Sequence, residues 1–283
     1  MPYQNILYDK DDHIATITLN RPDKLNALSF ELVEEVVAAA EEAEADDNVR
    51  VVILKGAGRA FSAGYDVGPG NYRKKGKPTL TSKLLLYRRM SGQCYKLWNL
   101  AKPLLAQVHG YCLAGATDLA LSCDIVVCAQ DAVFGLPDVR GLGSVPTHMW
   151  TYLVGPQWAK QLMMTGDPLD GTTAERIGLV WKAVPADTLD EEVRTLARRI
   201  SNVPLEFLIP HKSLINNIMA MMGHGVAQHL ATDTVVITSH SEAGHRFSEI
   251  SEKEGLRAAL QWMNGPFGDY SARPREKKPK KSS

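Results

Sequence analysis

The chain of 283 residues lacks several features that mark specialised classes of protein. Its 32 basic side chains balance its 32 acidic ones, so no net charge would draw in nucleic acid or a membrane surface. No apolar run approaches the roughly 18 residues of a membrane span. Residues 1–12 lack the cationic and apolar regions of a secretory signal. We therefore expect a globular protein in the cytoplasm, with no membrane and no nucleic acid among its partners.

Cysteine is scarce, and neither cysteine nor histidine shows a metal-binding spacing. The cysteines form no C-x-x-C pair and lie in apolar segments, which indicates buried thiols in a reducing compartment. The histidines form no H-E-x-x-H motif. We expect no disulfide framework and no metal site. The cysteines are Cys94, Cys112, Cys123 and Cys128.

Two partial motifs fail on inspection. Gly56-Ala57-Gly58 follows a strand signal, but Phe61 stands where a dinucleotide-binding fingerprint needs its third glycine. Ser62 lies in a segment that approaches a nucleophile elbow, yet the first glycine of that motif is missing. Residues 273–283 form a basic tail without aromatic residues, which we expect to be disordered and not to recognise nucleic acid.

Strand and helix signals alternate along the first two thirds of the chain, which implies parallel crossovers and an α/β fold. The predicted strands are 13–19, 51–54, 103–108, 124–129 and 180–184. The predicted helices are 29–47 with Ser29 as N-cap, 80–100, 116–122, 156–164, 172–177 and 188–200.

Helical spacing continues over 204–222 and 252–263, and no strand signal follows residue 204. We therefore divide the chain into a core at 1–203, a helical region at 204–270 and the basic tail at 271–283. Residues 68–77 are rich in Gly, Lys and Pro without periodicity, so they predict a mobile surface loop.

Two glycine-rich turns carry the strongest functional signal. One follows the strand at 51–54 and ends in Ala63-Gly64-Tyr65, and the other covers 109–118. Turns of this kind deliver backbone N–H groups to a polarised ligand atom. The second turn also precedes a short helix, whose dipole adds about half a positive charge at its N-terminus. Together the two turns predict an oxyanion hole.

At these residues the chain resembles the crotonase (enoyl-CoA hydratase/isomerase) superfamily. The resemblance implies an α/β spiral of ββα units with a C-terminal helical region that assembles a homotrimer or a dimer of trimers. It implies an acyl-CoA thioester whose carbonyl oxygen lies between the N–H groups of Tyr65 and Gly115. No cofactor is implied, since coenzyme A is part of the substrate. The matching segments are 19–28, 61–66, 110–124, 134–138, 162–167 and 178–180.

Two aspartates, Asp118 and Asp138, occupy the positions where hydratases of this family carry glutamates. Hydration needs two carboxyl groups that face each other across a water and share one proton. Aspartate is one methylene shorter, so the gap would widen by about two ångströms on an unchanged backbone, which would disturb near-attack geometry. Some isomerases of the family use aspartate at the first position. Both residues are therefore predicted proton-transfer groups.

The resemblance also places contacts to the substrate or to CoA along three segments. Lys24, with Lys74, Lys75 and Lys77, could meet the CoA phosphates, or these lysines form an ordinary solvated face. Asp66 could equally cap the following turn. The predicted contacts are Lys24, Leu25, Ala27, Ala63, Gly64, Asp66, Val67, Pro137, Arg140 and His148.

Three side chains near the predicted site have open interpretations. Arg140 either lowers the pKa of Asp138 and keeps it ionised, or is a solvated neighbour. His148 either donates a proton or contacts the acyl group, or simply packs at a helix N-terminus. The Tyr65 ring replaces a small residue and could narrow the acyl pocket or stack on a flat acyl group.

The leading hypothesis is an enzyme that hydrates an enoyl-CoA or shifts its double bond through an enolate. A CoA-dependent carbon–carbon bond hydrolase or lyase would use the same oxyanion hole. A protein that binds acyl-CoA without turnover is the alternative from another class, suggested by the two aspartates and the altered segment at 139–149.

Overall fold

The computed structural model describes residues 3–67, 79–144, 146 and 148–268. Its strands are β1 (Ile6–Asp11), β2 (Ile14–Leu19), β3 (Val51–Gly56), β4 (Leu104–Val108), β5 (Tyr111–Leu113), β6 (Ile125–Ala129), β7 (Val133–Gly135), β8 (Leu169–Asp170) and β9 (Lys182–Val184). Its α-helices are α1 (Phe30–Ala45), α2 (Leu80–Trp98), α3 (Gly115–Leu121), α4 (His148–Thr165), α5 (Gly171–Arg176), α6 (Leu189–Ser201), α7 (Leu205–Met221), α8 (His224–Thr238), α9 (Glu242–Lys253) and α10 (Leu256–Asn264). Two 3₁₀ turns are η1 (Pro22–Lys24) and η2 (Pro137–Arg140).

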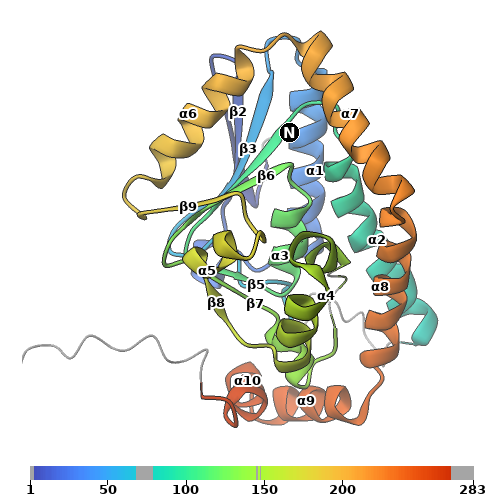
Figure 1. Ribbon diagram of the computed structural model, residues 1–283. Helices are drawn as coiled ribbons and strands as arrows, with labels where there is room; N and C mark the ends of the chain where they lie inside the picture. Colours follow the sequence, from blue (N-terminus) through green and yellow to red (C-terminus); the bar gives the residue numbers. More distant parts are fainter. Residues whose placement is uncertain (1–2, 68–78, 145, 147, 269–283) are drawn as a thin grey trace, which may run out of the picture.

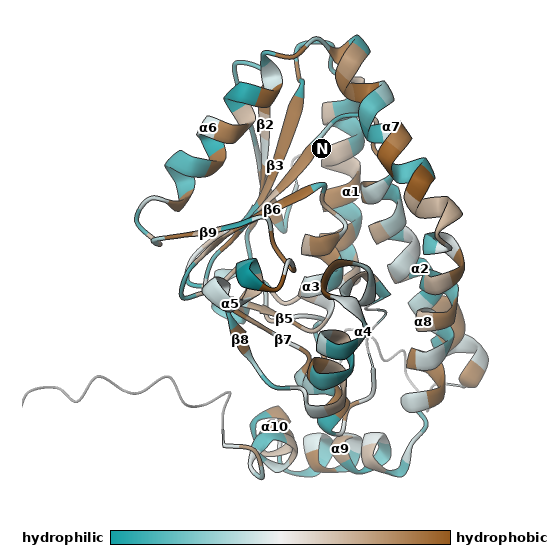
Figure 2. Ribbon diagram, viewed as in Figure 1, coloured by the Kyte–Doolittle hydropathy of each residue, from teal (hydrophilic) through white to brown (hydrophobic). Residues whose placement is uncertain are grey.

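A six-stranded sheet in the order β1-β2-β3-β4-β6-β9 forms the centre of the molecule. Only the β1–β2 pair is antiparallel among these neighbours. The central strands are almost continuously apolar and buried, as a parallel sheet covered on both faces requires. Helix α6 covers one face, and α1 and α3 lie against the other (Figure 1). Figure 2 shows these apolar strands beside helices that carry both hydrophobic and hydrophilic residues.

A second sheet of three short strands has the order β5-β7-β8. Strands β4 and β6 belong to the large sheet, whereas β5 and β7, which follow them in the chain, belong to the small one. Successive turns of chain therefore add one strand to each sheet, and the predicted α/β spiral of ββα units is confirmed. The short strands were not predicted because two or three residues show no detectable period.

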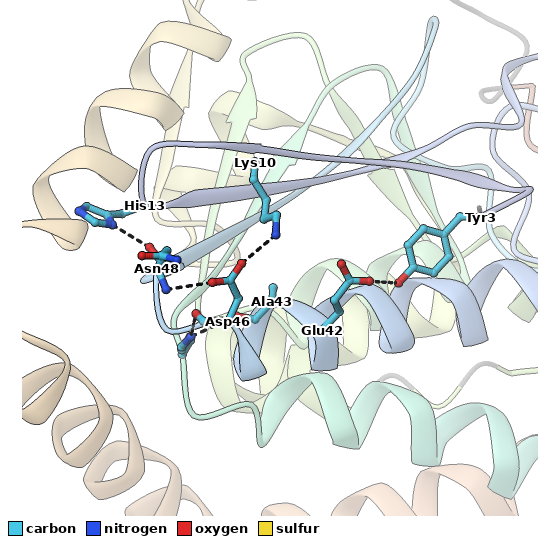
Figure 3. A network of polar contacts seen from close by, with 8 residues as sticks. Tyr3, Lys10, His13, Glu42, Ala43, Asp46 and Asn48 are labelled. Carbon is cyan, nitrogen blue, oxygen red and sulfur yellow. Dashed lines mark hydrogen bonds and ion pairs between the residues drawn. The ribbon is translucent and has the colours of Figure 1, made fainter. Parts of the chain in front are cut away.

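Strand β1 was also not predicted, because its sequence carries three charged residues at its end and most of its side chains are exposed. Charge is typical of edge strands, where it prevents pairing with another chain. Polar contacts join β1 and the residues on either side of it to α1 and the loop that follows α1 (Figure 3). Lys10 Nζ lies 2.8 Å from Asp46, the Tyr3 hydroxyl donates to Glu42, and His13 Nδ1 donates to the Asn48 carbonyl.

Helix α1 follows the sequence prediction closely. The Ser29 hydroxyl accepts the Leu32 N–H at 3.2 Å, which satisfies one of the free donors of the first turn. Leu32, Val36 and Ala43 are buried on the face that packs on the sheet.

Of the four predicted buried thiols, those of Cys112, Cys123 and Cys128 are buried and that of Cys94 is half-buried, and all four are free.

Four helices, α4, α8, α9 and α10, differ from the prediction. Helix α4 begins at His148, eight residues before Pro156, and Gly155 with φ 74° marks a kink that the sequence suggested as a start. The helix predicted at 252–263 is instead the end of α9 and the whole of α10, separated by Gly255 with φ 94°. Helix α8 was not predicted, because its exposed apolar residues leave it without a clear polar face.

The helices after residue 204 pack on α2 and α4 and on one another (Figure 1). No helix within the described ranges is long and apolar enough to cross a membrane. The division at residue 204 stays a prediction. The predicted loop at 68–77 and the tail at 271–283 lie outside the described residues.

A buried ion pair fixes α7 to the sheet. Lys212 Nζ lies 2.7 Å from Asp124 Oδ2 and also donates to the Lys102 carbonyl, and its side chain is 8% exposed. Removing one partner leaves a buried charge, which typically costs about 3 to 5 kcal/mol. We predict that Lys212→Met lowers the free energy of unfolding by about 3 kcal/mol in urea titrations. The exposed lysine in Lys10→Met should change it much less, and equal losses in both variants would contradict this account.

Candidate active site

The first glycine turn is held against the segment that follows β2. The Ala63 N–H donates to Leu25, the Leu28 N–H donates to Gly64, and the Asp66 N–H donates to Leu28. This ladder orients residues 63–66 as a short strand beside 25–28. Because Leu28 bonds to the residues on either side of Tyr65, the Tyr65 N–H faces the opposite side, toward the second turn.

Asn26 is the residue that ties this turn together, and the prediction did not include it. Its side chain is fully buried and donates to the carbonyls of Ala57 and Ala60 at 2.8 and 2.9 Å. It has φ 52° and follows Leu25 with φ 51°. Positive φ in residues with a side chain is costly and accumulates at functional sites.

The second turn brings Gly115 to the start of α3. Ala114, at φ 52°, is a further residue with a side chain and positive φ, and its N–H donates to Gly135. No acceptor for the Gly115 N–H is found among the described residues. A Cβ on Gly64 would lie 2.7 Å from the Leu113 oxygen and 3.4 Å from the Gly115 nitrogen. The two turns are therefore in direct contact, and the Gly115 N–H at the start of α3 lies near that contact.

Asp118 lies in the first turn of α3 and is buried, with 6% of its surface exposed. Its Oδ2 is 3.4 Å from the Tyr65 hydroxyl. Burial raises the pKa of Asp118 well above its ordinary value, the Tyr65 contact lowers it, and the charge of Asp138 raises it further. Asp118 therefore holds its proton to a higher pH than an exposed aspartate does, and the charge of Asp138 contributes to this.

Asp138 is presented by the short turn η2, which Pro137 initiates. Its carbonyl accepts the N–H groups of Gly141, Leu142 and Gly143, so the turn is tightly closed. Its Oδ2 is buried without a partner among the described residues. Burial raises the pKa of Asp138 to about 7. Such an atom is a candidate to meet a ligand, since buried polar groups are otherwise paired.

Arg140 does not act on Asp138 as predicted. Its guanidinium points away, with Nε on the Thr165 carbonyl at 2.8 Å and one terminal nitrogen on Asp167 at 3.0 Å. It also stacks on Phe267, 3.9 Å from the ring centroid. The prediction of a lowered Asp138 pKa is wrong, because the pKa is raised and Arg140 is not among its causes. The alternative of a solvated side chain is also wrong, since only 1% of the Arg140 side chain is exposed.

His148 begins α4 and contacts a second histidine that the sequence did not single out. Its Nε2 lies 3.1 Å from Nε2 of His224, which stacks on Trp98. Burial and the charge of His224 lower the pKa of His148 to about 4, so this ring is neutral near pH 7, and burial also lowers the pKa of His224. His148 also lines a cavity of about 10 Å³ beside Asp118, room for one water. The other lining residues are Ser91, Cys94, Ser122, Pro146, Met149 and Gln228.

The remaining predicted contacts lie near the first turn. Lys24 is exposed, whereas Ala27 and Val67 are half-buried. Asp66 is buried and its carboxylate pairs with Arg21 at 2.9 Å. The turn that Asp66 was predicted to cap, and Lys74, Lys75 and Lys77, lie outside the described residues. Within the described ranges no cluster of three or more His, Cys, Asp or Glu could hold a metal ion.

Tyr87, on α2, lies near Asp138 and was not predicted. Burial raises its pKa, and the charge of Asp138 raises it further. Nothing in the helical spacing of α2 distinguishes this tyrosine from an ordinary packing residue, so only the folded structure reveals its position.

The raised pKa of Asp138 predicts a pH-dependent stability. Below about pH 4 this carboxyl is protonated in both the folded and the unfolded chain, so it has no effect. As pH rises from its ordinary pKa of 3.8 to about 7, only the unfolded chain releases the proton, and folding becomes less favourable. We predict that Asp138→Asn removes this penalty, up to about 4 kcal/mol above pH 7.

Urea unfolding at about pH 5 and about pH 8 measures this difference. The stability gain of Asp138→Asn should be larger at the higher pH. The exposed aspartate in Asp187→Asn is the control. A gain that is the same at both pH values would rule out the buried, proton-holding carboxyl.

Comparisons with known proteins identify the family of the chain. The family model for enoyl-CoA hydratase/isomerase matches residues 9–258. The chain is 38% identical to the putative enoyl-CoA hydratase EchA13 of Mycobacterium tuberculosis, over 77% of this chain and 74% of that protein. It is 34% identical to the crotonyl-CoA hydratase of Syntrophomonas wolfei, over 94% and 99%.

Among solved structures, the fold is similar to that of an enoyl-CoA hydratase/isomerase from Xanthobacter autotrophicus Py2. The TM-score is 0.88 at 34% identity, covering 94% of this chain and 99% of that one. The enoyl-CoA hydratase of Mycobacterium smegmatis has the same TM-score at 31% identity, covering 94% and 95%. The sequence match and the fold together show that the chain belongs to the enoyl-CoA hydratase/isomerase family.

Proposed function

We propose that the protein hydrates an enoyl-CoA thioester or shifts its double bond, with the N–H groups of Tyr65 and Gly115 as the oxyanion hole. The observation that carries this proposal is the direct contact of the two glycine turns beside two buried aspartates. The Gly115 N–H stands at the N-terminus of α3, where the helix dipole favours negative charge. A thioester oxygen there would gain charge as the enolate forms, and preorganised donors lower that barrier.

The two carboxyl groups would divide the proton transfers. Asp118, whose pKa is raised well above its ordinary value by burial, is suited to give a proton to the α-carbon. Asp138, with a pKa of about 7, is suited to take one from water or from the substrate. Because the charge of Asp138 disfavours ionisation of Asp118, the pair is suited to share one proton during the reaction. Isomerisation would use the same two groups without adding water.

The coenzyme would extend over the exposed edge of the first turn. Lys24 is exposed there, next to the half-buried Leu25 and Ala27. A cation at that place suits the phosphates of CoA. The acyl end would enter between the two turns, toward Asp118 and Asp138.

We predict that Asp118→Asn and Asp138→Asn each lower kcat by about 100- to 10,000-fold, because each removes one proton-transfer group. Turnover of crotonyl-CoA, longer 2-enoyl-CoAs and 3-enoyl-CoAs measures it. Binding of the saturated butanoyl-CoA should stay within about threefold, since only the transition state uses the carboxyls. Binding without turnover of any of these thioesters by the unmodified protein would contradict the proposal and leave a non-catalytic binder or a carbon–carbon hydrolase.

We also propose a homotrimer or a dimer of trimers, assembled through α7 and α8. These helices and Met222, which follows α7, carry a large set of exposed apolar side chains, and patches of this kind mark contact surfaces. They are Phe207, Leu214, Ile215, Ile218, Met221, Met222, Val226, Leu230 and Ile237.

Light scattering would then give three or six times the mass of one chain. We predict that Met221→Glu combined with Leu230→Glu shifts the protein toward the monomer, because charge would be buried at the contact. Leu7→Glu, at an exposed position on β1, is the control. If the unmodified protein were a monomer, the proposed trimer would be wrong.

A further inference from the structure

The Tyr65 side chain lies flat on the start of α3. A Cβ added to Gly115 would lie 2.4 Å from Tyr65 Cε2 and 2.6 Å from both Cδ2 and Cζ. Nearly equal distances to three consecutive ring atoms mean that the Gly115 Cα faces the ring plane and not its edge. Only glycine leaves room for this contact. The ring is thereby fixed beside the very N–H that is proposed to bind the thioester oxygen.

This position brings the Tyr65 hydroxyl to Asp118. The two oxygens, phenolic and Oδ2, are 3.4 Å apart, which is longer than a strong O–H···O bond and within reach of one after a small shift. Asp118 is 6% exposed, whereas Tyr65 is only half-buried. Of the two residues, Tyr65 is therefore the more accessible from outside.

The reach of Asp118 is the difficulty that this arrangement addresses. An aspartate ends one methylene short of a glutamate, and the carboxyl is held back among buried residues of α3. Proton transfer requires heavy atoms within about 3.2 Å. A hydroxyl between carboxyl and substrate would close such a gap.

We propose that Tyr65 carries the proton between Asp118 and the acyl α-carbon, so that the two residues together act as one acid–base group. This inference rests on the proposed function. Tyr65 then has two roles, since its backbone N–H holds the thioester oxygen and its hydroxyl touches the reacting carbon.

The step balances without any further reactant. The enolate electron pair forms a C–H bond with the phenolic proton, and the phenolic O–H bond breaks. The phenolic oxygen takes the Asp118 carboxyl proton at the same time. Tyr65 is again a neutral phenol afterwards, Asp118 is a carboxylate, and the reverse sequence removes a proton from the α-carbon.

The test combines Tyr65→Phe with a longer carboxyl. Tyr65→Phe keeps the ring on Gly115 and removes only the hydroxyl, so kcat should fall by about 100-fold or more, with butanoyl-CoA binding within about threefold. Adding Asp118→Glu to that variant supplies the missing methylene and should recover at least about tenfold of the loss. Tyr8→Phe removes a hydroxyl that is buried in the edge strand β1 and is the matched control.

The outcomes separate the two levels of proposal. If the unmodified protein turns over and Asp118→Asn does not, but Tyr65→Phe keeps kcat within about twofold, the relay is wrong and the proposed function stands. A Tyr65→Phe loss that Asp118→Glu does not recover likewise overturns the relay, because the hydroxyl then acts on structure alone. No turnover by the unmodified protein is instead a failure of the proposed function.

Discussion

The structure depends on a contact between two stretches of backbone with no side chain separating them. Gly64 lies against Leu113 and Ala114 so closely that a single added carbon would overlap their atoms. Such an approach needs glycine, and it needs both turns to be held by other parts of the fold. Asn26 holds the first through buried hydrogen bonds, and the small sheet holds the second. The spiral of ββα units supplies this geometry, because it repeatedly returns the chain to the same edge.

Around that contact, burial controls the chemistry. Neither aspartate has a cation within the described site to neutralise it, so each retains its proton to a higher pH than an exposed carboxyl would. The cost of this arrangement appears in stability, and under the proposed function its benefit is a carboxyl, that of Asp138, whose pKa of about 7 suits it to exchange a proton near neutral pH. Arg140, the cation nearest to Asp138 in the sequence, instead donates to the Thr165 carbonyl and pairs with Asp167.

Much of the fold could be predicted from the sequence because its signals are local. The run Val51 to Leu54, the Ser29 cap and the two glycine turns are each readable within a few residues. Elements without local signals were not predicted. Strands β5, β7 and β8 are too short to show a period, and the charged residues of β1 interrupt its apolar pattern. Helix α8 resembles no single-faced helix, since its apolar residues point outward as well as inward.

The candidate site divides in the same way. Gly64, Gly115, Asp118 and Asp138 could be placed by motif, since each follows a recognisable turn. The directions of the side chains could not be predicted, because they depend on packing between segments distant in sequence. The Tyr65 hydroxyl contacts Asp118, which lies 53 positions farther along the sequence. The His148 contact to His224 spans 76 positions.

The Arg140 side chain has an effect beyond its own turn. It connects η2 to Asp167 and, through Asn264 and Phe267, to the end of α10. The last helices of the chain thus act as a brace for the turn that carries Asp138. Any displacement of α9 and α10, whether by a neighbouring subunit or by truncation near residue 264, would reach that carboxyl mechanically, without touching the two glycine turns.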